Sequence, residues 1–190
     1  MNSIIPEQFK KNFDRTLFTK CDICFQELIT EKRLYTIFKF YQDGECLVDM
    51  AMCDDCAHKL YKAYSTKSLK AMIDFYPSQD TWLRKQLLKV DTLRTGEVAK
   101  LVENYTNNCI ICDTDKGSTS SYLECAHGHG DSLVIGHAPY MQCENCMSEL
   151  YNKLSKKTVE AYNRFMRDSF GLPPDIYSYS TEDKEIFYFV

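Results

Sequence analysis

Eight of the ten cysteines stand in four Cys-x-x-Cys pairs, an arrangement that brings two sulfur atoms to one metal ion. The two pairs of each half are separated by 28 residues in the first half of the chain and by 30 in the second. Because zinc prefers a tetrahedron of ligands, two pairs complete its coordination and leave no position for water or substrate. The sequence therefore predicts two structural zinc ions per chain, the first bound by Cys21, Cys24, Cys53 and Cys56 and the second by Cys109, Cys112, Cys143 and Cys146.

Two other uses of such pairs stay open at this point. Iron in a rubredoxin-like site also takes two pairs, but that family favours glycine-rich turns, and here the residues after the pairs are Phe25, Ala57, Asp113 and Met147. A thioredoxin-like redox pair needs one Cys-x-x-Cys within a βαβ unit, and four pairs disfavour that use.

The N-terminal residues lack the basic start and apolar core of a secretory signal, and no apolar run reaches the roughly 18 residues needed to span a membrane. We therefore expect a cytoplasmic protein. A reducing compartment disfavours disulfides, which again directs the cysteines to a metal.

The chain contains the same unit twice. Shifting the sequence by 90 positions places the second cysteine pair of the first half, and the residues after it, on their counterparts in the second half. The matching residues are Cys53, Cys56, Leu60, Tyr61, Ser65, Lys67, Ala71 and Phe75, which fall on Cys143, Cys146, Leu150, Tyr151, Ser155, Lys157, Ala161 and Phe165. This agreement indicates an internal duplication.

Each unit is predicted to form a β-hairpin between its two cysteine pairs. In the first unit, β-rich residues 34–41 and 46–50 flank the turn signal Asp43-Gly44. In the second unit, residues 121–126 lead into a His-Gly-His-Gly-Asp turn and residues 132–135 return from it.

Helical periodicity follows the second cysteine pair of each unit. Ser65 and Ser155 are the predicted N-caps of a further short helix in the first and second unit. Residues 78–105 join the units and predict two helical segments broken near Gly96, and residues 185–190 predict a short apolar strand.

A Cys-x-x-Cys turn, or knuckle, followed by a hairpin and a second knuckle that opens a helix is the order of the treble-clef zinc fingers, and both halves resemble that group. The resemblance implies an α+β fold: two treble-clef zinc-binding lobes (knuckle–hairpin–knuckle–helix) with pseudo-twofold repetition and a helical linker. It implies no function, because treble clefs serve many unrelated tasks. Residues 51–60 also resemble a little-described bacterial family without an assigned activity.

We expect the chain to divide at the ends of these units. The spacing of Phe9, Phe13 and Leu17 adds an amphipathic helix near the N-terminus. The expected organisation is 1–77 for the N-terminal helix and first lobe, 78–105 for the linker, 106–172 for the second lobe and 173–190 for a tail with a short strand.

Four residues of the second half form a candidate patch that the repeat does not explain. Cys125, His127 and His129 alternate along a predicted strand, so their side chains project to one face, and His137 follows nearby. These residue types could hold a further metal or form a catalytic patch. The alternative, which we favour, is a small buried cysteine beside histidines in a polar turn.

HNH-type nucleases share the treble-clef core, and by resemblance His127 would be the base, with Asn145 or Asp131 as a supporting residue. Such nucleases usually carry an Asp-His pair at the start of this strand, whereas Glu124-Cys-Ala precedes His127 here. The first half has no histidine in its hairpin. These departures make a nuclease the alternative function rather than the expected one.

The charge of the chain disfavours broad nucleic-acid binding. Its formal net charge is −4, whereas phosphate neutralisation needs a basic face. The lysine-bearing helices around Lys67 and Lys157 keep nucleic-acid binding open as an alternative, although acidic residues interrupt them. We expect a non-enzymatic, zinc-stabilised binding module or accessory subunit that docks on another protein and has no membrane contact.

Overall fold

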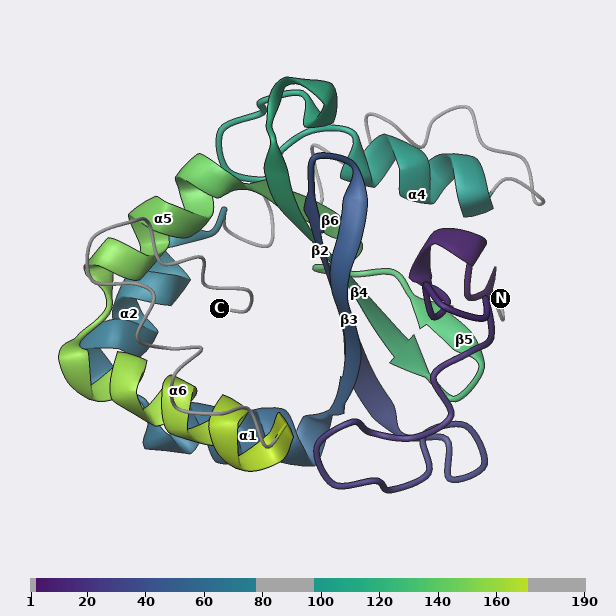
Figure 1. The fold of residues 1–190 in the computed structure, drawn as a ribbon, viewed down its shortest axis with the longest axis horizontal. Coiled ribbons are helices and arrows are strands. Elements are labelled where there is room, and N and C mark those ends of the chain that lie inside the picture. The colour runs from purple at the N-terminus through teal and green to yellow at the C-terminus, as the bar shows by residue number, and fades with distance from the viewer. Residues whose placement is uncertain (1–2, 78–97, 171–190) are drawn as a thin grey trace.

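One antiparallel sheet forms the centre of the protein, with helices on both of its faces (Figure 1). The computed structural model describes residues 3–77 and 98–170. The elements are β1 Ser3–Ile4, a 3-10 turn Glu7–Phe9, β2 Leu34–Gln42, β3 Glu45–Cys53, α1 Asp54–Ala63, α2 Thr66–Phe75, α4 Val98–Thr106, a 3-10 turn Lys116–Ser118, β4 Ser121–His129, β5 Ser132–Val134, β6 Tyr140–Cys143, α5 Glu144–Lys153 and α6 Lys156–Phe170. The architecture is α+β, as the sequence predicts.

The two halves of the chain share this sheet. Its strand order is β1-β5-β4-β2-β3, and β6 pairs with β4 beside β5. β2 and β4 pair along their whole length, from Leu34 opposite His129 to Gln42 opposite Ser121. The hairpin of the first half and the strands of the second are therefore hydrogen-bonded to each other through β2 and β4.

The first hairpin has the predicted form. β2 and β3 are joined by Asp43 and Gly44, whose φ angles are 51° and 84°. Positive φ at both positions is the geometry of the two-residue turn that matches strand twist, and glycine adopts it without strain.

The second hairpin differs from the prediction. β4 continues through His127 and Gly128 to His129, so the turn lies at Gly130 and Asp131 instead. Pairing with both β2 and β5 satisfies the backbone groups of these residues and keeps them in the strand. Gly128 also fits the sheet because the Tyr35 ring lies over it: a Cβ atom there would be 2.3 Å from that ring.

Four helices cover one face of the sheet and pack across the two halves. α1 contacts α6, and α2 contacts α5. Ser65 and Ser155 are N-caps as predicted, since their hydroxyls accept from the N–H groups of Ser68 and Thr158 at 3.1 and 3.3 Å. The caps also meet each other, with 2.8 Å between the Ser65 and Ser155 Oγ atoms.

The backbone N–H groups of Ser65 and Ser155 also form a reciprocal pair of hydrogen bonds with the other half. The Ser65 N–H donates to Thr158 Oγ1 at 3.0 Å, and the Ser155 N–H donates to Ser68 Oγ at 2.8 Å. In a capping box the third helical residue returns a bond to its own N-cap. Here each third residue binds the N-cap of the other half, so the helix starts hold the halves together.

The predicted N-terminal helix over Phe9, Phe13 and Leu17 is wrong. Only the short turn Glu7–Phe9 is helical, and the Asp14 carboxylate accepts from the Thr16 N–H and hydroxyl at 2.9 and 2.7 Å. Such side-chain bonds to nearby backbone compete with a helix. Phe9 is buried, whereas Phe13 is 99% exposed, so the spacing does not mark one buried face.

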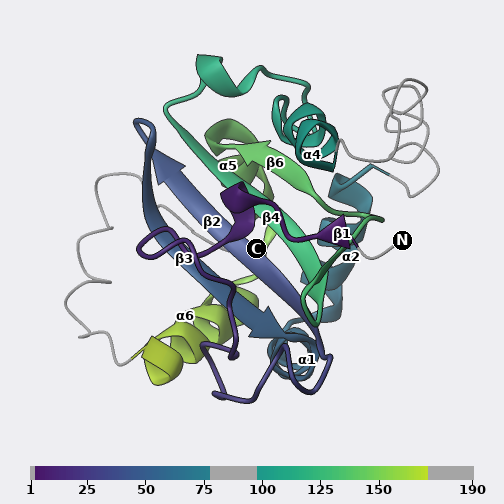
Figure 2. The ribbon, with the colours of Figure 1, turned by 90° about the vertical axis from the view of Figure 1, so that its right-hand side faces the viewer.

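The N-terminal segment instead runs across the second face of the sheet, beside α4 (Figure 2). A network of polar side chains around the buried Glu124 holds it there. Lys39 and Glu124 are opposite each other on β2 and β4, and both are 1% exposed. The Gln8 side-chain amide donates to Glu124 at 3.3 Å and to Thr106 of α4 at 3.1 Å, and Lys116 forms an ion pair with Glu124. This network connects the sheet, α4 and the N-terminal segment.

α4 confirms the second predicted linker helix. The first linker segment, around residues 82–90, and the predicted strand 185–190 lie outside the described residues. The described helices include no candidate for a membrane-spanning segment.

Candidate metal centres

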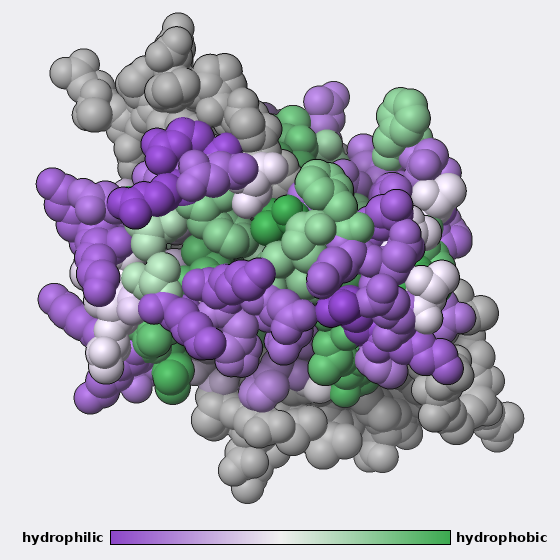
Figure 3. Space-filling model, turned by 90° about the horizontal axis from the view of Figure 1, so that it is seen from below, coloured by the Kyte–Doolittle hydropathy of each residue, from purple (hydrophilic) through white to green (hydrophobic). Residues whose placement is uncertain are grey.

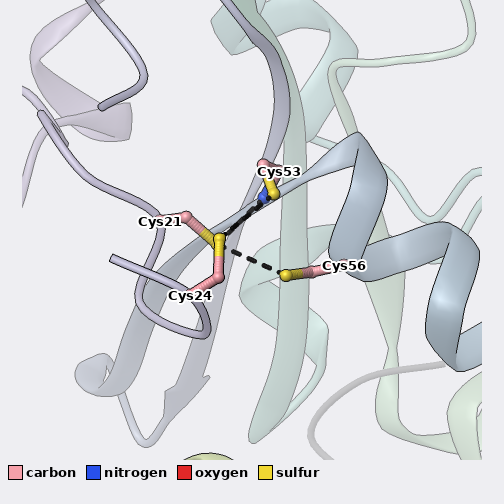
Figure 4. A group of neighbouring side chains, drawn as sticks. All are labelled: Cys21, Cys24, Cys53 and Cys56. Carbon is pink, nitrogen blue, oxygen red and sulfur yellow. Dashed lines mark hydrogen bonds between the residues drawn. The ribbon is translucent and has the colours of Figure 1, made fainter. Parts of the chain in front are cut away.

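The first site is formed by Cys21, Cys24, Cys53 and Cys56, whose sulfur atoms all lie within 4.8 Å of one another. Figure 4 shows the four side chains converging from the first knuckle, the end of β3 and the first turn of α1. The Sγ atoms of Cys24 and Cys53 are 3.7 Å apart, and those of Cys21 and Cys56 are 3.9 Å apart. A tetrahedron with sulfur about 2.3 Å from its centre has edges of about 3.8 Å, so these two distances fit the edges of a zinc tetrahedron.

The second site repeats this arrangement with Cys109, Cys112, Cys143 and Cys146. Its cysteines come from the second knuckle, the end of β6 and the first turn of α5. The Sγ atoms of Cys112 and Cys143 are 3.5 Å apart, again close to a tetrahedral edge. All eight cysteines are free of disulfides.

Backbone hydrogen bonds shape each knuckle. In the first, the Cys21 N–H donates to the Gln26 carbonyl at 2.9 Å, and the Phe25 N–H donates to the Cys21 carbonyl at 2.8 Å. The second knuckle repeats both bonds, from Cys109 to Thr114 at 2.8 Å and from Asp113 to Cys109 at 2.9 Å. This turn needs a left-handed residue after the second cysteine, and φ is 60° at Phe25 and 64° at Asp113.

Helix starts complete both sites. Cys53 and Cys143 are the N-cap residues of α1 and α5, and their N–H groups donate to the sulfur atoms of Cys21 and Cys109 at 3.3 and 3.4 Å. Hydrogen bonds to sulfur and the positive end of a helix both favour the thiolate form, which is the form that binds metal.

The four thiols of a site nevertheless cannot all ionise without a cation. Burial, together with the neighbouring cysteines, raises the pKa of Cys53 to about 11 and that of Cys143 to about 11, and it raises the pKa of Cys56 and Cys146 further. At Cys112 burial acts in the same direction, but hydrogen bonds from Thr114 and the other cysteines outweigh it and lower the pKa to about 6. A divalent cation supplies the charge that lets four sulfurs ionise together, so each group can bind one zinc ion.

The candidate patch in the second half does not gather around one point. Cys125 is 2% exposed in the centre of the sheet, and burial raises its pKa to about 12. His127 is half-buried, and burial and the nearby His137 lower its pKa. His129 and His137 are exposed. Within residues 3–77 and 98–170, the two four-cysteine groups are the ones that meet the geometry of a metal site, and these four residues form no third group.

In the HNH resemblance His127 is supported by Asn145, which lies in α5, or by Asp131. The neighbours that influence the charge of His127 are His137 and Asp54 of α1. Asp131 instead lies in the turn after β4, where its charge acts on Tyr35.

Asp22, between the two cysteines of the first knuckle, connects the site to β3, although no motif marks it. Its carboxylate accepts from the Ala51 N–H at 2.7 Å, and its own N–H donates to the Ala51 carbonyl at 2.9 Å. In the second knuckle, Ile110 keeps the backbone bond, to Met141 at 2.8 Å, but has no carboxylate for the other. The partner of Asp22 is a backbone group 29 residues away, which spacing alone does not indicate.

Comparison with protein-family models, with curated sequences and with solved structures found no match to this chain.

Proposed function

We propose that this protein is a non-enzymatic, zinc-stabilised binding module that docks on another protein. Each four-cysteine group supplies four sulfur ligands, and a zinc ion with four protein ligands has no open position for a substrate. The metal then contributes folding free energy rather than chemistry.

The internal arrangement that we propose is two treble-clef units related by a pseudo-twofold axis. Cys53 lies opposite Tyr35 and Cys143 lies opposite Tyr122, so each unit ends its last strand at the same place. The offset of 87 residues between Tyr35 and Tyr122 also relates Phe38 to Cys125. Those two residues pair with each other across β2 and β4, as an axis between the strands requires. The reciprocal bonds at the helix starts of α2 and α6 support the same axis.

Phe25 carries the docking part of the proposal. Its φ of 60° is a left-handed conformation that costs a bulky residue about 1 kcal/mol. Its side chain is also 70% exposed, so burial in this chain offsets little of that cost. The second knuckle has Asp113 at this position, a residue type that tolerates the conformation better. A strained, exposed aromatic residue is therefore best explained by contact with a partner.

The face of the molecule that carries this knuckle has exposed apolar surface. The lower face in Figure 1 is formed by α1, α6 and the segment that leads into β2, which contains the first knuckle. On that face apolar residues gather in the middle, between hydrophilic ones (Figure 3). Exposed apolar surface with a polar rim is typical of protein-binding sites.

Photo-crosslinking tests the proposal. Benzoylphenylalanine is placed at position 25, and at position 113 as the matched control, and the protein is expressed in its native cell. We expect one protein to be crosslinked from position 25 and not from position 113.

A Phe25→Asn variant measures the contribution of the side chain to that interaction. Burying a phenylalanine contributes about 2 kcal/mol, so the affinity for the crosslinked protein should fall about 30-fold, while Asp113→Asn leaves it unchanged. Equal crosslinking from both positions, or unchanged affinity of Phe25→Asn, would contradict docking through Phe25.

Metal analysis and a histidine variant test the rest. Elemental analysis should find two zinc ions per chain, and iron or a single zinc would overturn the metal assignment. A metal-dependent hydrolytic activity that His127→Ala abolishes would instead support the nuclease alternative.

A further inference from the structure

The two four-cysteine sites have the same ligands but different surroundings, and this difference has a chemical consequence. We propose that the second site is a modification site for soft electrophiles and peroxide, at which Cys112 reacts first and the second zinc ion is released while the first is retained.

Exposure separates one cysteine from the other seven. Cys21, Cys53 and Cys56 of the first site, and Cys109, Cys143 and Cys146 of the second, are between 0% and 4% exposed. Cys24 is partly exposed, and Cys112 is exposed. Since a reagent must reach the sulfur atom, Cys112 is the first ligand that it meets.

The neighbours of the Cys112 and Cys24 sulfur atoms also favour reaction at Cys112. Cys112 Sγ has the hydroxyl of the small Thr114 side chain 3.1 Å away. Cys24 Sγ has the longer Gln26 side chain beside it, with the amide oxygen 3.8 Å away.

Packing makes the second site easier to open. The cysteines of the first site belong to the main core, together with Leu28, Ile37 and Leu60. The three buried cysteines of the second site form a separate small cluster with Met141, against which Phe75, Ile111 and Tyr122 pack. Local opening costs less free energy where fewer buried apolar groups must separate.

The knuckles are also attached differently. The Asp22 carboxylate accepts from the Ala51 N–H of β3, in addition to the backbone and sulfur hydrogen bonds that both knuckles form with their strands. Ile110 cannot accept such a bond. The second knuckle can therefore move away from β6 at lower cost.

The reactions are those of an accessible thiolate. With iodoacetamide, Cys112 Sγ displaces iodide and forms an S–C bond, and the resulting thioether is a much weaker metal ligand. With hydrogen peroxide, Cys112 Sγ attacks one oxygen and the O–O bond breaks. Hydroxide departs, and Cys112 becomes a sulfenic acid.

A neighbouring ligand can then complete the oxidation. Cys143 Sγ, 3.5 Å from Cys112 Sγ, displaces hydroxide from the sulfenic acid to form a disulfide. The two sulfurs lose two electrons, and peroxide takes these with two protons to become two water molecules. Either modification removes ligands from the second site alone.

The experiment uses the full chain loaded with two zinc ions. The protein is treated with limiting iodoacetamide, the modified cysteines are identified by peptide mass spectrometry, and released zinc is measured with a chromogenic chelator. We expect Cys112 to be modified at least about tenfold faster than Cys24. One zinc ion per chain, that of the second site, should be released before the other. Hydrogen peroxide should give a Cys112–Cys143 disulfide with the same single release.

Two variants sharpen the result. Thr114→Gln should slow the modification of Cys112, and Asp22→Ala should accelerate that of Cys24. Equal rates at Cys24 and Cys112, earlier reaction at Cys24, or simultaneous release of both zinc ions from the unmutated chain would overturn the proposal.

Discussion

The two four-cysteine sites have the same backbone conformation but differ in the residues that pack around them. Both knuckles make the same turn, and the first-pair sulfurs Cys21 and Cys109 accept the same N–H bonds from the starts of α1 and α5. The first site, however, is part of the main core, whereas the second is a separate small cluster. The comparison shows that ligand geometry is local, while the stability of a site depends on what packs around it.

A second contrast lies between the tyrosines beside the sites. Tyr122, opposite Cys143, stacks on Tyr41 with 4.8 Å between the ring centroids. Tyr35, opposite Cys53, lies over Gly128 and donates to the Gly130 carbonyl at 2.9 Å. Tyr122 thus packs against another aromatic ring, whereas Tyr35 packs in the space that Gly128 leaves because it has no side chain.

Removing one buried ligand from each site should give the largest effects. A structural zinc contributes on the order of 10 kcal/mol, comparable with the whole stability of a domain, about 5–15 kcal/mol. We expect Cys53→Ser to unfold most of the chain, because its site is part of the main core, and Cys143→Ser to lose one zinc and keep most of the sheet. Far-UV circular dichroism with zinc analysis measures both, and equal unfolding by the two variants would contradict the asymmetry.

Gly128→Ala should have the next largest effect. The added methyl would be 2.3 Å from the Tyr35 ring, which is buried and cannot move without disturbing the sheet. We expect a loss of about 3 kcal/mol in the free energy of unfolding. Urea denaturation measures it, and the double variant Gly128→Ala with Tyr35→Leu should recover part of the loss if the ring is the cause.

Asparagine at the two knuckle positions should change the free energy of unfolding by different amounts. Phe25→Asn relieves left-handed strain and should stabilise the protein by about 0.5 kcal/mol, because asparagine tolerates this conformation. Asp113→Asn should change stability by no more than a few tenths of a kcal/mol, since both residues tolerate it. Thermal denaturation at constant zinc compares them. Destabilisation by Phe25→Asn would show that Phe25 packs within its own chain.

The smallest effect concerns pH. The pKa of His127 is lowered by burial and by His137, so the folded state binds fewer protons than the unfolded state. Its contribution to stability is present above the unfolded pKa, about 6.5, and is lost as the pH falls through the folded value.

A His127→Phe variant should show less loss of stability between pH 7.5 and 5.5. Phenylalanine is the residue at position 40, which the offset of 87 makes the counterpart of His127. Urea denaturation at both pH values, with zinc content as the control, compares the two proteins. An unchanged pH dependence would exclude His127 as its source.

Features that depend on short stretches of sequence were predicted best. The ligand spacing, the Asp43-Gly44 turn, and the N-caps Ser65 and Ser155 each depend on a few adjacent residues, and the structure confirms them. The predicted N-terminal helix failed because a local side-chain turn at Asp14 competes with apolar spacing. The predicted turn of the second hairpin is misplaced because the His-Gly-His residues 127–129 are held in β4 by β2 and β5.

The sequence by itself determined two four-sulfur sites and the elements that carry them, because ligand spacing, turn residues and helix caps act over short distances. Only the tertiary structure decided that β2 and β4 join the halves into one sheet and that each half binds the helix start of the other. It also decided that one site lies in the main core and the other beside it. The contacts between the halves join residues far apart in the sequence, such as the pairs 87 and 93 positions apart at the helix starts. Packing and burial select such partners, and no local pattern identifies them.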